Sequence, residues 1–416
     1  MVRPGRRGLN RRPGVRAVTV AAALVAAALV AAGLAGCDRP MAGSAAPAAW
    51  VDRALGGVSL TQTPNVVSEP AARDVAGILA DAEDFWRPLL VGHRTPVTGG
   101  YTLIDTAATA PAGEPAICAG AGEVLSGNAL YCPSQDRIVL DAAALVPVLR
   151  DSYGVGGLAA SLAHEFGHAV QARIRPPAEQ PDSRSPQLLL EAQADCAAGA
   201  FLQWVVDGHS RRLHLPAGAL PESVAPLLDF RDAPTAPGDA ASGTARPIHG
   251  LSLDRLRFVL RGMRDGPAAC WGMTAAGLRL TLSRAGTGPE GSHRFADLAA
   301  VSAAAQTSVG SFDRSAPVRV ADPRDTAAAA PYGQFAQAAA TALATGRGRY
   351  PNRAGAACFT GAWTSAVFGT AGAGQLGSWP GDADEALDLV RNRPGTTWAE
   401  MAAFADGFDR GLSACR

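Results

Sequence analysis

The clearest pattern along this chain is a run of apolar residues spaced three and four apart, which begins after Glu69-Pro70. This spacing places the apolar side chains on one stripe of an α-helix, and the acidic residues between them are expected mostly to face water. We therefore predict an amphipathic packing helix over about residues 69–89. Its apolar stripe comprises Val75, Ile78, Leu79, Ala82, Phe85, Trp86 and Leu89.

Two short runs at residues 99–105 and 136–141 are rich in β-branched or aromatic residues and are flanked by turn formers, so we predict strands there. Apolar residues at helical spacing then predict a helix over 158–174, which Pro176-Pro177 stops. A further helix is expected to start at Ser185-Pro186. Together these elements predict an α+β fold with a small sheet.

The last third of the chain is rich in Ala and is divided by clusters of Gly and Pro. This composition predicts a mostly helical C-terminal region over residues 269–416. Its helices are expected at about 292–308, 323–346, 357–371, 382–392 and 397–414.

The composition supports a folded protein and excludes nucleic acid as a partner. The chain has 416 residues, 48% of them hydrophobic, and its 37 basic residues are all Arg. Six of these Arg precede residue 37, so the remaining chain has 31 basic and 37 acidic residues, a net charge of −6. A chain with this balance offers no basic surface for nucleic acid.

The N-terminus is predicted to direct export. Residues 1–36 combine an Arg-rich start with an uncharged run dominated by Ala, Val and Leu, which is typical of a signal peptide. The run ends in Leu34-Ala35-Gly36-Cys37, which resembles a bacterial lipobox, so Cys37 is expected to carry a lipid anchor. An uncleaved membrane-spanning helix is the alternative, and both place the body outside the cytoplasmic membrane. Residues 37–68 are predicted to be a flexible tether.

Six cysteines follow Cys37. Cys118 and Cys132 lie close together in sequence, and in an exported protein such a local pair is expected to form a disulfide. The other four allow three pairings, among which the sequence does not choose: Cys196, Cys270, Cys358 and Cys415.

The predicted helix over 158–174 contains the pattern His164-Glu165-Phe166-Gly167-His168. Residues four apart share a helix face, so the two imidazoles can bind one metal ion while Glu165 handles a water molecule. Two histidines around a glutamate are also hard to bury in an apolar helix without an ion. The pattern predicts a catalytic Zn²⁺ site with His164 and His168 as ligands and Glu165 as general base.

A catalytic zinc site normally has three protein ligands and one open position, so a third ligand is expected further along the chain. Glu191 and Asp195 are four apart in an otherwise apolar helix. We predict Glu191 as the third ligand and Asp195 as the acceptor for the free ring N–H of a ligand histidine.

These segments resemble a bacterial family of neutral zinc metallopeptidases of the gluzincin class. The likeness covers about residues 70–268, although Phe166 and Ala169 differ from residues that are frequent in the family. The resemblance implies a zincin-like catalytic domain. It rests on four motifs beside the histidine helix: Leu79-Ala80-Asp81-Ala82-Glu83-Asp84-Phe85-Trp86, Tyr131-Cys132-Pro133 with Ile138-Val139-Leu140-Asp141, Glu191-Ala192-Gln193-Ala194-Asp195-Cys196, and His249-Gly250-Leu251-Ser252-Leu253-Asp254-Arg255.

Peptide hydrolysis also needs a donor for the developing oxyanion. His249 is our candidate, because it precedes Ser252, the expected N-cap of a helix over 253–264. A purely structural His249 is the competing interpretation, and His209, His214 and Tyr153 are weaker candidates.

The expected protein is a lipid-anchored, extracytoplasmic zinc metallopeptidase that acts on peptide or protein substrates. Its predicted parts are a signal peptide at 1–36, a tether at 37–68, a catalytic domain at 69–268 and a helical region at 269–416. The alternative is a non-catalytic surface lipoprotein that retains the zinc scaffold and binds a partner. The sequence leaves the oligomeric state and the cleavage preference open.

Overall fold

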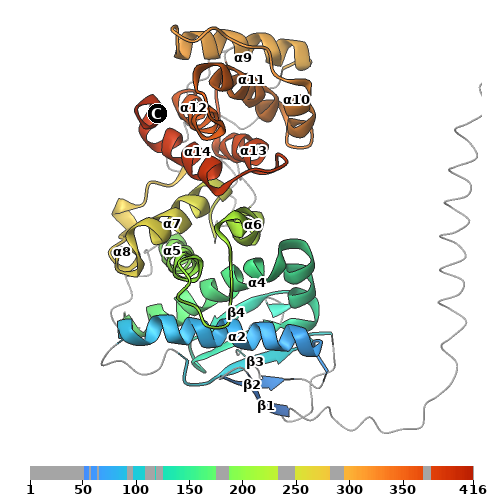
Figure 1. Ribbon diagram of the computed structural model, residues 1–416, viewed down its shortest axis with the longest axis vertical. Helices are drawn as coiled ribbons and strands as arrows, with labels where there is room; N and C mark the ends of the chain where they lie inside the picture. The colour runs from blue at the N-terminus through green and yellow to red at the C-terminus, as the bar shows by residue number, and fades with distance from the viewer. Residues whose placement is uncertain are drawn as a thin grey trace, which may run out of the picture. The chain divides into compact units, whose positions relative to one another are not determined.

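Figure 1 shows the chain as a computed structural model. The residues described are 51–55, 58–62, 65–90, 97–107, 118, 125–174, 187–232, 249–281, 295–368 and 376–415. They all belong to one compact unit, Ala48–Arg416. The predicted signal peptide and Cys37 with its predicted lipid lie outside the described residues. Within the ranges just given, no helix is both long and apolar enough to span a membrane.

A five-stranded mixed sheet forms one layer, with strand order β1-β2-β3-β5-β4. The pairs β1/β2 and β4/β5 are antiparallel, whereas β2/β3 and β3/β5 are parallel. β4 is therefore an edge strand. The bounds are Val51–Leu55 for β1, Val58–Gln62 for β2, Tyr101–Ile104 for β3, Ala129–Cys132 for β4 and Arg137–Asp141 for β5.

The prediction of a tether over 37–68 is wrong for β1 and β2. In β2 the side chains alternate, with Val58 and Leu60 buried and Ser59 exposed between them. This alternation covers only five residues, so it does not stand out in a segment rich in Ala, Pro and Gly. Parallel pairing with β3, in which Leu60 lies opposite Tyr101, is what makes the segment a strand.

Two helices pack against the sheet and against each other: α2 (Glu69–Trp86) and α4 (Ala142–Ile174). The predicted apolar stripe of α2 is buried from Val75 to Trp86, and a 3₁₀ turn, η1 (Arg87–Leu90), follows. Asp81 was expected to face water with its neighbours, but it is fully buried. It accepts hydrogen bonds from Arg212 and from the Leu213 N–H, because the loop after helix α5 (Gln187–Val206) folds back onto α2.

The histidine pattern lies in the second half of α4. This helix starts earlier than the predicted 158, and it bends at Gly154, where φ is 68° and ψ is −175°. A φ in this left-handed region suits glycine, which has no Cβ to clash with the backbone. The bend separates the first helical segment, which follows β5, from the segment that bears His164.

A second group of helices follows α4, and α5 and α6 of this group pack against it. The group comprises α5 (Gln187–Val206), η3 (Ala217–Ala219), α6 (Leu220–Asp229), α7 (Ser252–Asp265), α8 (Pro267–Trp271) and η5 (Ala275–Gly277). α5 packs between α4 and α7. Gly199 of α5 and Gly262 of α7 face the backbone of the opposite helix so closely that a Cβ on either would overlap a carbonyl oxygen. These two glycines allow the close approach of α5 and α7.

The C-terminal region is helical, as predicted, and its helices α13 and α14 contact α7. The expected helix over 323–346 is two helices, because Gly333 with φ 130° interrupts it. The domain boundary at 268/269 stays a prediction. The elements are α9 (Leu298–Phe312), α10 (Pro323–Ala329), α11 (Gln334–Arg349), α12 (Arg353–Ala366), α13 (Pro380–Arg391), α14 (Trp398–Arg410) and η7 (Gly411–Ala414).

Three cysteine pairs are formed in the structure. Cys118 pairs with Cys132, the local pair expected from the sequence. The sequence left the pairing of the other four open. In the structure Cys196 pairs with Cys270, with their Cα atoms 5.5 Å apart, and Cys358 pairs with Cys415, with their Cα atoms 5.4 Å apart. The first of these two ties α5 to α8, and the second ties α12 to the end of the chain.

The prediction that Ser252 caps a helix over 253–264 is wrong. Ser252 is the first residue of α7, and its hydroxyl donates to the Leu228 carbonyl. The two oxygens of Asp384, on α13, instead accept the backbone N–H groups of Ser252 and Leu253, both at 3.0 Å. A carboxylate from the C-terminal region therefore satisfies the N-terminus of α7.

A second carboxylate, Asp136, fixes the turn between β4 and β5. It accepts hydrogen bonds from the Thr98 N–H at 2.8 Å, the Tyr131 hydroxyl at 2.8 Å and the Arg173 guanidinium of α4 at 2.5 Å. Burial alone would raise the pKa of Asp136, but the hydrogen bonds from Arg173 and Thr98 outweigh it and lower the pKa to about 2. Asp136 thus holds the edge of the sheet against α4.

Replacing Asp136 with Asn should lower the free energy of unfolding by about 1 kcal/mol at pH 7, allowing for the partial exposure of the carboxylate. The pKa is depressed in the folded state, so this contribution is present above the unfolded-state value of 3.8 and disappears as the pH falls toward 2. Urea unfolding of wild type and Asp136→Asn at pH 7 and pH 2.5 measures the difference. The exposed Asp151→Asn is the control, and an equal Asp136 effect at both pH values contradicts the prediction.

Candidate metal centre

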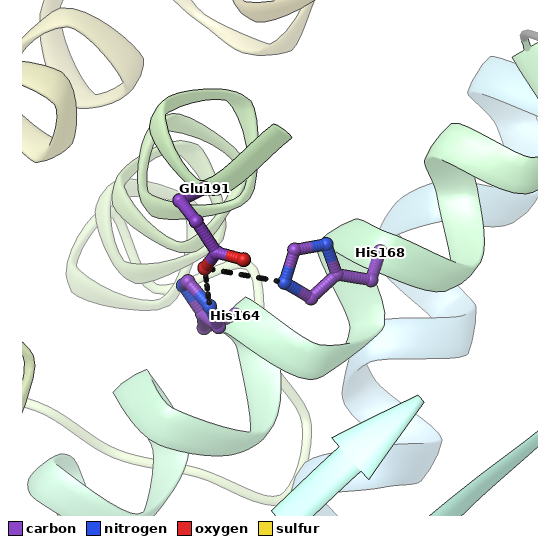
Figure 2. Close-up of side chains that lie close together, drawn as sticks. All are labelled: His164, His168 and Glu191. Carbon is purple, nitrogen blue, oxygen red and sulfur yellow. Dashed lines mark hydrogen bonds and ion pairs between the residues drawn. The ribbon is translucent and has the colours of Figure 1, made fainter. Parts of the chain in front are cut away.

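His164, His168 and Glu191 converge from two helices, α4 and α5 (Figure 2). The Nε2 atoms of His164 and His168 lie 3.2 and 3.6 Å from Glu191 Oε2, and the three ligand atoms are all within 4.8 Å of one another. Donors bound tetrahedrally at about 2.05 Å from zinc would be separated by about 3.3 Å. The spacing of these three side chains therefore fits a single tetrahedral ion.

Both histidines are oriented by a hydrogen bond at the opposite ring nitrogen. Asp195 Oδ1 lies 2.8 Å from His164 Nδ1, and Gln171 Oε1 lies 2.9 Å from His168 Nδ1. Each acceptor fixes the Nδ1–H tautomer and directs Nε2 toward Glu191. Asp195 takes the place predicted for it, whereas Gln171 was not singled out, although it lies one turn after His168 on the same helix.

The electrostatics of this group favour a cation. Burial opposes a charge on the His164 ring, but hydrogen bonds with Asp195 and Glu191 outweigh it and raise the pKa to about 10. Burial likewise opposes a charge on Glu191, yet the two histidines hold its pKa well below the ordinary value. The buried carboxylates thus create a negative potential at the ring nitrogens.

Glu165 lines a cleft together with His164. Its Oε2 accepts a hydrogen bond of 2.9 Å from the backbone N–H of Tyr131 on the edge strand β4. Burial is the largest influence on Glu165 and raises its pKa. The carboxylate is held between the histidine helix and the sheet, beside His164.

The cleft has a volume of about 430 Å³ and is bordered by three parts of the chain. Residues 126–129, which lead into β4, form one side, and His164 and Glu165 of α4 form another. The third side comes from the end of α6 and the connection to α7, and consists of Leu227, Asp229, Phe230, Arg231 and His249. Of the four candidate donors to the oxyanion, His249 is the one found among the described residues that line the cleft. The other three, Tyr153, His209 and His214, are not among those lining residues.

His249 is held by a neighbouring acid. Asp232 Oδ2 accepts the backbone N–H groups of His249 and Gly250 at 2.9 and 2.7 Å, and the His249 ring nitrogen Nδ1 lies 3.6 Å from Asp232 Oδ1. The His249 side chain is 39% exposed. The imidazole is thus anchored at its base and accessible from the cleft.

Arg255 also belongs to this centre, although the sequence predicted no role for it beyond its place in a motif. It is 2% exposed, and its guanidinium donates to both oxygens of Asp195, at 2.9 and 2.7 Å. A third donor reaches the Phe230 carbonyl at 2.9 Å. Burial opposes ionisation of Asp195, but Arg255 and His164 outweigh it and lower its pKa. The available signal was the spacing: of the four Arg of α7, Arg255 lies four residues from both Leu251 and Val259, on the apolar face, and a buried guanidinium requires an anionic partner.

No family model, no curated protein and no solved structure matches this chain. The α+β class is what the structure shows, while the zincin-like fold and the likeness to neutral zinc metallopeptidases stay predictions based on the motifs. A function must therefore be argued from the geometry of the centre itself.

Arg255→Met should destabilise the protein by about 3–5 kcal/mol, because it leaves Asp195 as a buried carboxylate without its cation. Adding Asp195→Asn should recover part of that loss, since a neutral amide can still accept the His164 ring N–H. Chemical unfolding of the single and double variants measures both effects. The control is Arg264→Met. Arg264 lies on α7, as Arg255 does, but its ion pair with Asp406 of α14 is exposed, so the substitution should cost less than about 1 kcal/mol. A double variant no more stable than Arg255→Met contradicts this account.

Proposed function

We propose that this protein is a zinc-dependent metallopeptidase. The observation that carries the proposal is the placement of Glu165 at the cleft, next to His164 and beside three donors with tetrahedral spacing. The sequence adds a zincin-like catalytic domain over 69–268 and an extracytoplasmic location with a lipid anchor at Cys37. Peptide or protein chains are the proposed substrates.

Zinc suits this donor set better than other common ions. Two imidazoles and one carboxylate form the three-ligand set of catalytic zinc sites, whereas calcium and magnesium prefer oxygen ligands. Three protein donors leave one position open, while structural zinc sites are closed by four. When bound here, zinc would lower the pKa of a water molecule to roughly 7 and polarise a carbonyl group.

The chain's own residues supply the remaining chemistry. Glu165 would accept a proton from the attacking water and deliver it to the leaving amine. The Tyr131 N–H keeps the Glu165 carboxylate directed to the cleft, and His249 is the proposed donor to the developing oxyanion.

A non-catalytic zinc scaffold is the competing function. It would need neither an open coordination position nor an acid at the cleft. The support for catalysis is that Glu165 lies at the cleft without belonging to the donor group.

The purified protein should bind one zinc ion per chain, and zinc at 100 times its Kd should raise the free energy of unfolding by about 2.7 kcal/mol. His164→Ala and Glu191→Ala should abolish both effects, because two donors do not form the site. Elemental analysis and thermal unfolding with and without a chelator provide the measurements. His214→Ala, at an exposed position, is the matched control. Undiminished zinc binding by His164→Ala would show that the ion lies elsewhere.

Glu165→Gln should retain zinc but lower the rate of peptide cleavage by about 10²–10⁴-fold, because the amide cannot accept the proton. A peptide library digested by wild type and variant, with zinc content measured on the same preparations, tests this expectation. Glu222→Gln, an exposed Glu on α6, should cleave like wild type. Equal cleavage by Glu165→Gln would falsify the mechanism, and a zinc-loaded wild type that cleaves nothing would favour the scaffold.

A further inference from the structure

One aromatic side chain at the cleft, that of Phe230, is largely exposed to solvent. Among the described residues, the large hydrophobic side chains left exposed are Leu89, Val148, Phe230, Leu298, Val318 and Val320. Phe230 is the aromatic member of this set, is 47% exposed and lines the same cleft as Glu165 and His249. Exposed apolar surface beside a cleft is typical of a ligand-binding site.

The backbone around Phe230 is rigidly held. The Phe230 N–H donates to the Pro226 carbonyl at 2.9 Å, and its own carbonyl accepts from Arg255 at 2.9 Å. The residues on either side are fixed as well. Asp229 accepts hydrogen bonds from Tyr153 and Arg391, and Arg231 donates to Ser252 and Asp388. The ring is therefore carried on a backbone that is already ordered before a ligand binds, which lowers the entropic cost of binding.

The charges next to the ring are already paired. Asp229 lies 2.5 Å from Arg391, and Arg231 lies 3.4 and 3.1 Å from the carboxylates of Asp384 and Asp388. Two Arg and three Asp leave this wall with at most one net negative charge, which disfavours an acidic ligand group. Leu145 and Leu227 also line the cleft, at 6% and 3% exposure, behind the more exposed Phe230 ring. The chemistry of the wall favours an apolar group over an acidic one.

We propose that Phe230, with Leu145 and Leu227, forms a subsite that selects peptides with a large apolar side chain next to the bond that is cut. This inference rests on the proposed peptidase function. Because the subsite borders Glu165, a side chain that covers the ring would place the neighbouring peptide bond near the proposed base. Contact with an aromatic ring favours Leu or Phe over Ser and excludes Asp, whose charge would lose its hydration.

Cleavage of matched peptides tests the subsite. A peptide that wild type cleaves is remade with Leu, Phe, Ser or Asp at each residue flanking the cut. Wild type should prefer Leu and Phe at one flanking position, and Phe230→Ala should lower kcat/KM for those peptides by about tenfold to hundredfold. Cleavage of the Ser peptide should change less than about twofold, because it does not use the ring. Phe230→Leu should restore most of the activity.

Leu298→Ala, which removes another exposed apolar side chain, is the matched control and should leave every rate unchanged. Zinc content and thermal unfolding of Phe230→Ala should equal those of wild type. No apolar preference in wild type, or an equal loss on Leu and Ser peptides, overturns the proposal.

A binding measurement separates this proposal from the proposed function. Calorimetry with zinc-loaded Glu165→Gln uses a fixed set of short peptides that differ only in carrying Leu, Phe, Ser or Asp at one position, chosen without regard to cleavage. It should show tighter binding of the Leu and Phe members, and this difference should vanish when Phe230→Ala is added. If wild type cleaves no peptide but this difference is found, the peptidase function fails and the apolar site stands. If wild type cleaves with no apolar preference, the site fails and the peptidase function stands.

Discussion

The candidate metal centre depends on the buried contact among Arg255, Asp195 and His164, which come from three different helices. Asp195 is fully buried, so its charge must be balanced inside the protein. Arg255 of α7 supplies the cation, and His164 of α4 supplies a ring N–H. Because Asp195 lies on α5, this one carboxylate fixes the relative position of α4, α5 and α7. Glu191, one turn earlier on α5, then reaches the histidines with one carboxylate oxygen, while the Gln187 amide donates to the other at 2.7 Å.

The C-terminal region supports this arrangement at the N-terminal end of α7, the same end that bears Arg255. Asp384 satisfies the first N–H groups of α7, the helix that bears Arg255. Arg231, on the wall of the cleft, lies between Asp384 and Asp388 of the same C-terminal helix. Residues more than a hundred positions after the histidine pattern therefore position both the centre and the cleft. The C-terminal helices are structural components of the site.

The sheet contributes to the site through its edge. β4 ends the strand order, and the Tyr131 N–H in it donates to Glu165. Asp136 joins the β4–β5 turn to Arg173, which follows His168 on α4 by little more than one turn. Arg173 also donates to the Tyr131 hydroxyl of β4 at 3.0 Å. These hydrogen bonds couple the position of the edge strand to that of the histidine helix.

Local patterns in the sequence determined the elements of the site, because helical periodicity depends only on neighbouring residues. They placed His164 and His168 on one face of a helix and Glu191 and Asp195 on one face of another. Only the tertiary structure brought these faces together and added Gln171 and Arg255, since such contacts depend on distances between segments that local propensity does not specify. For the same reason the strands β1 and β2, the pairing of four cysteines and the capping of α7 by Asp384 were decided by packing.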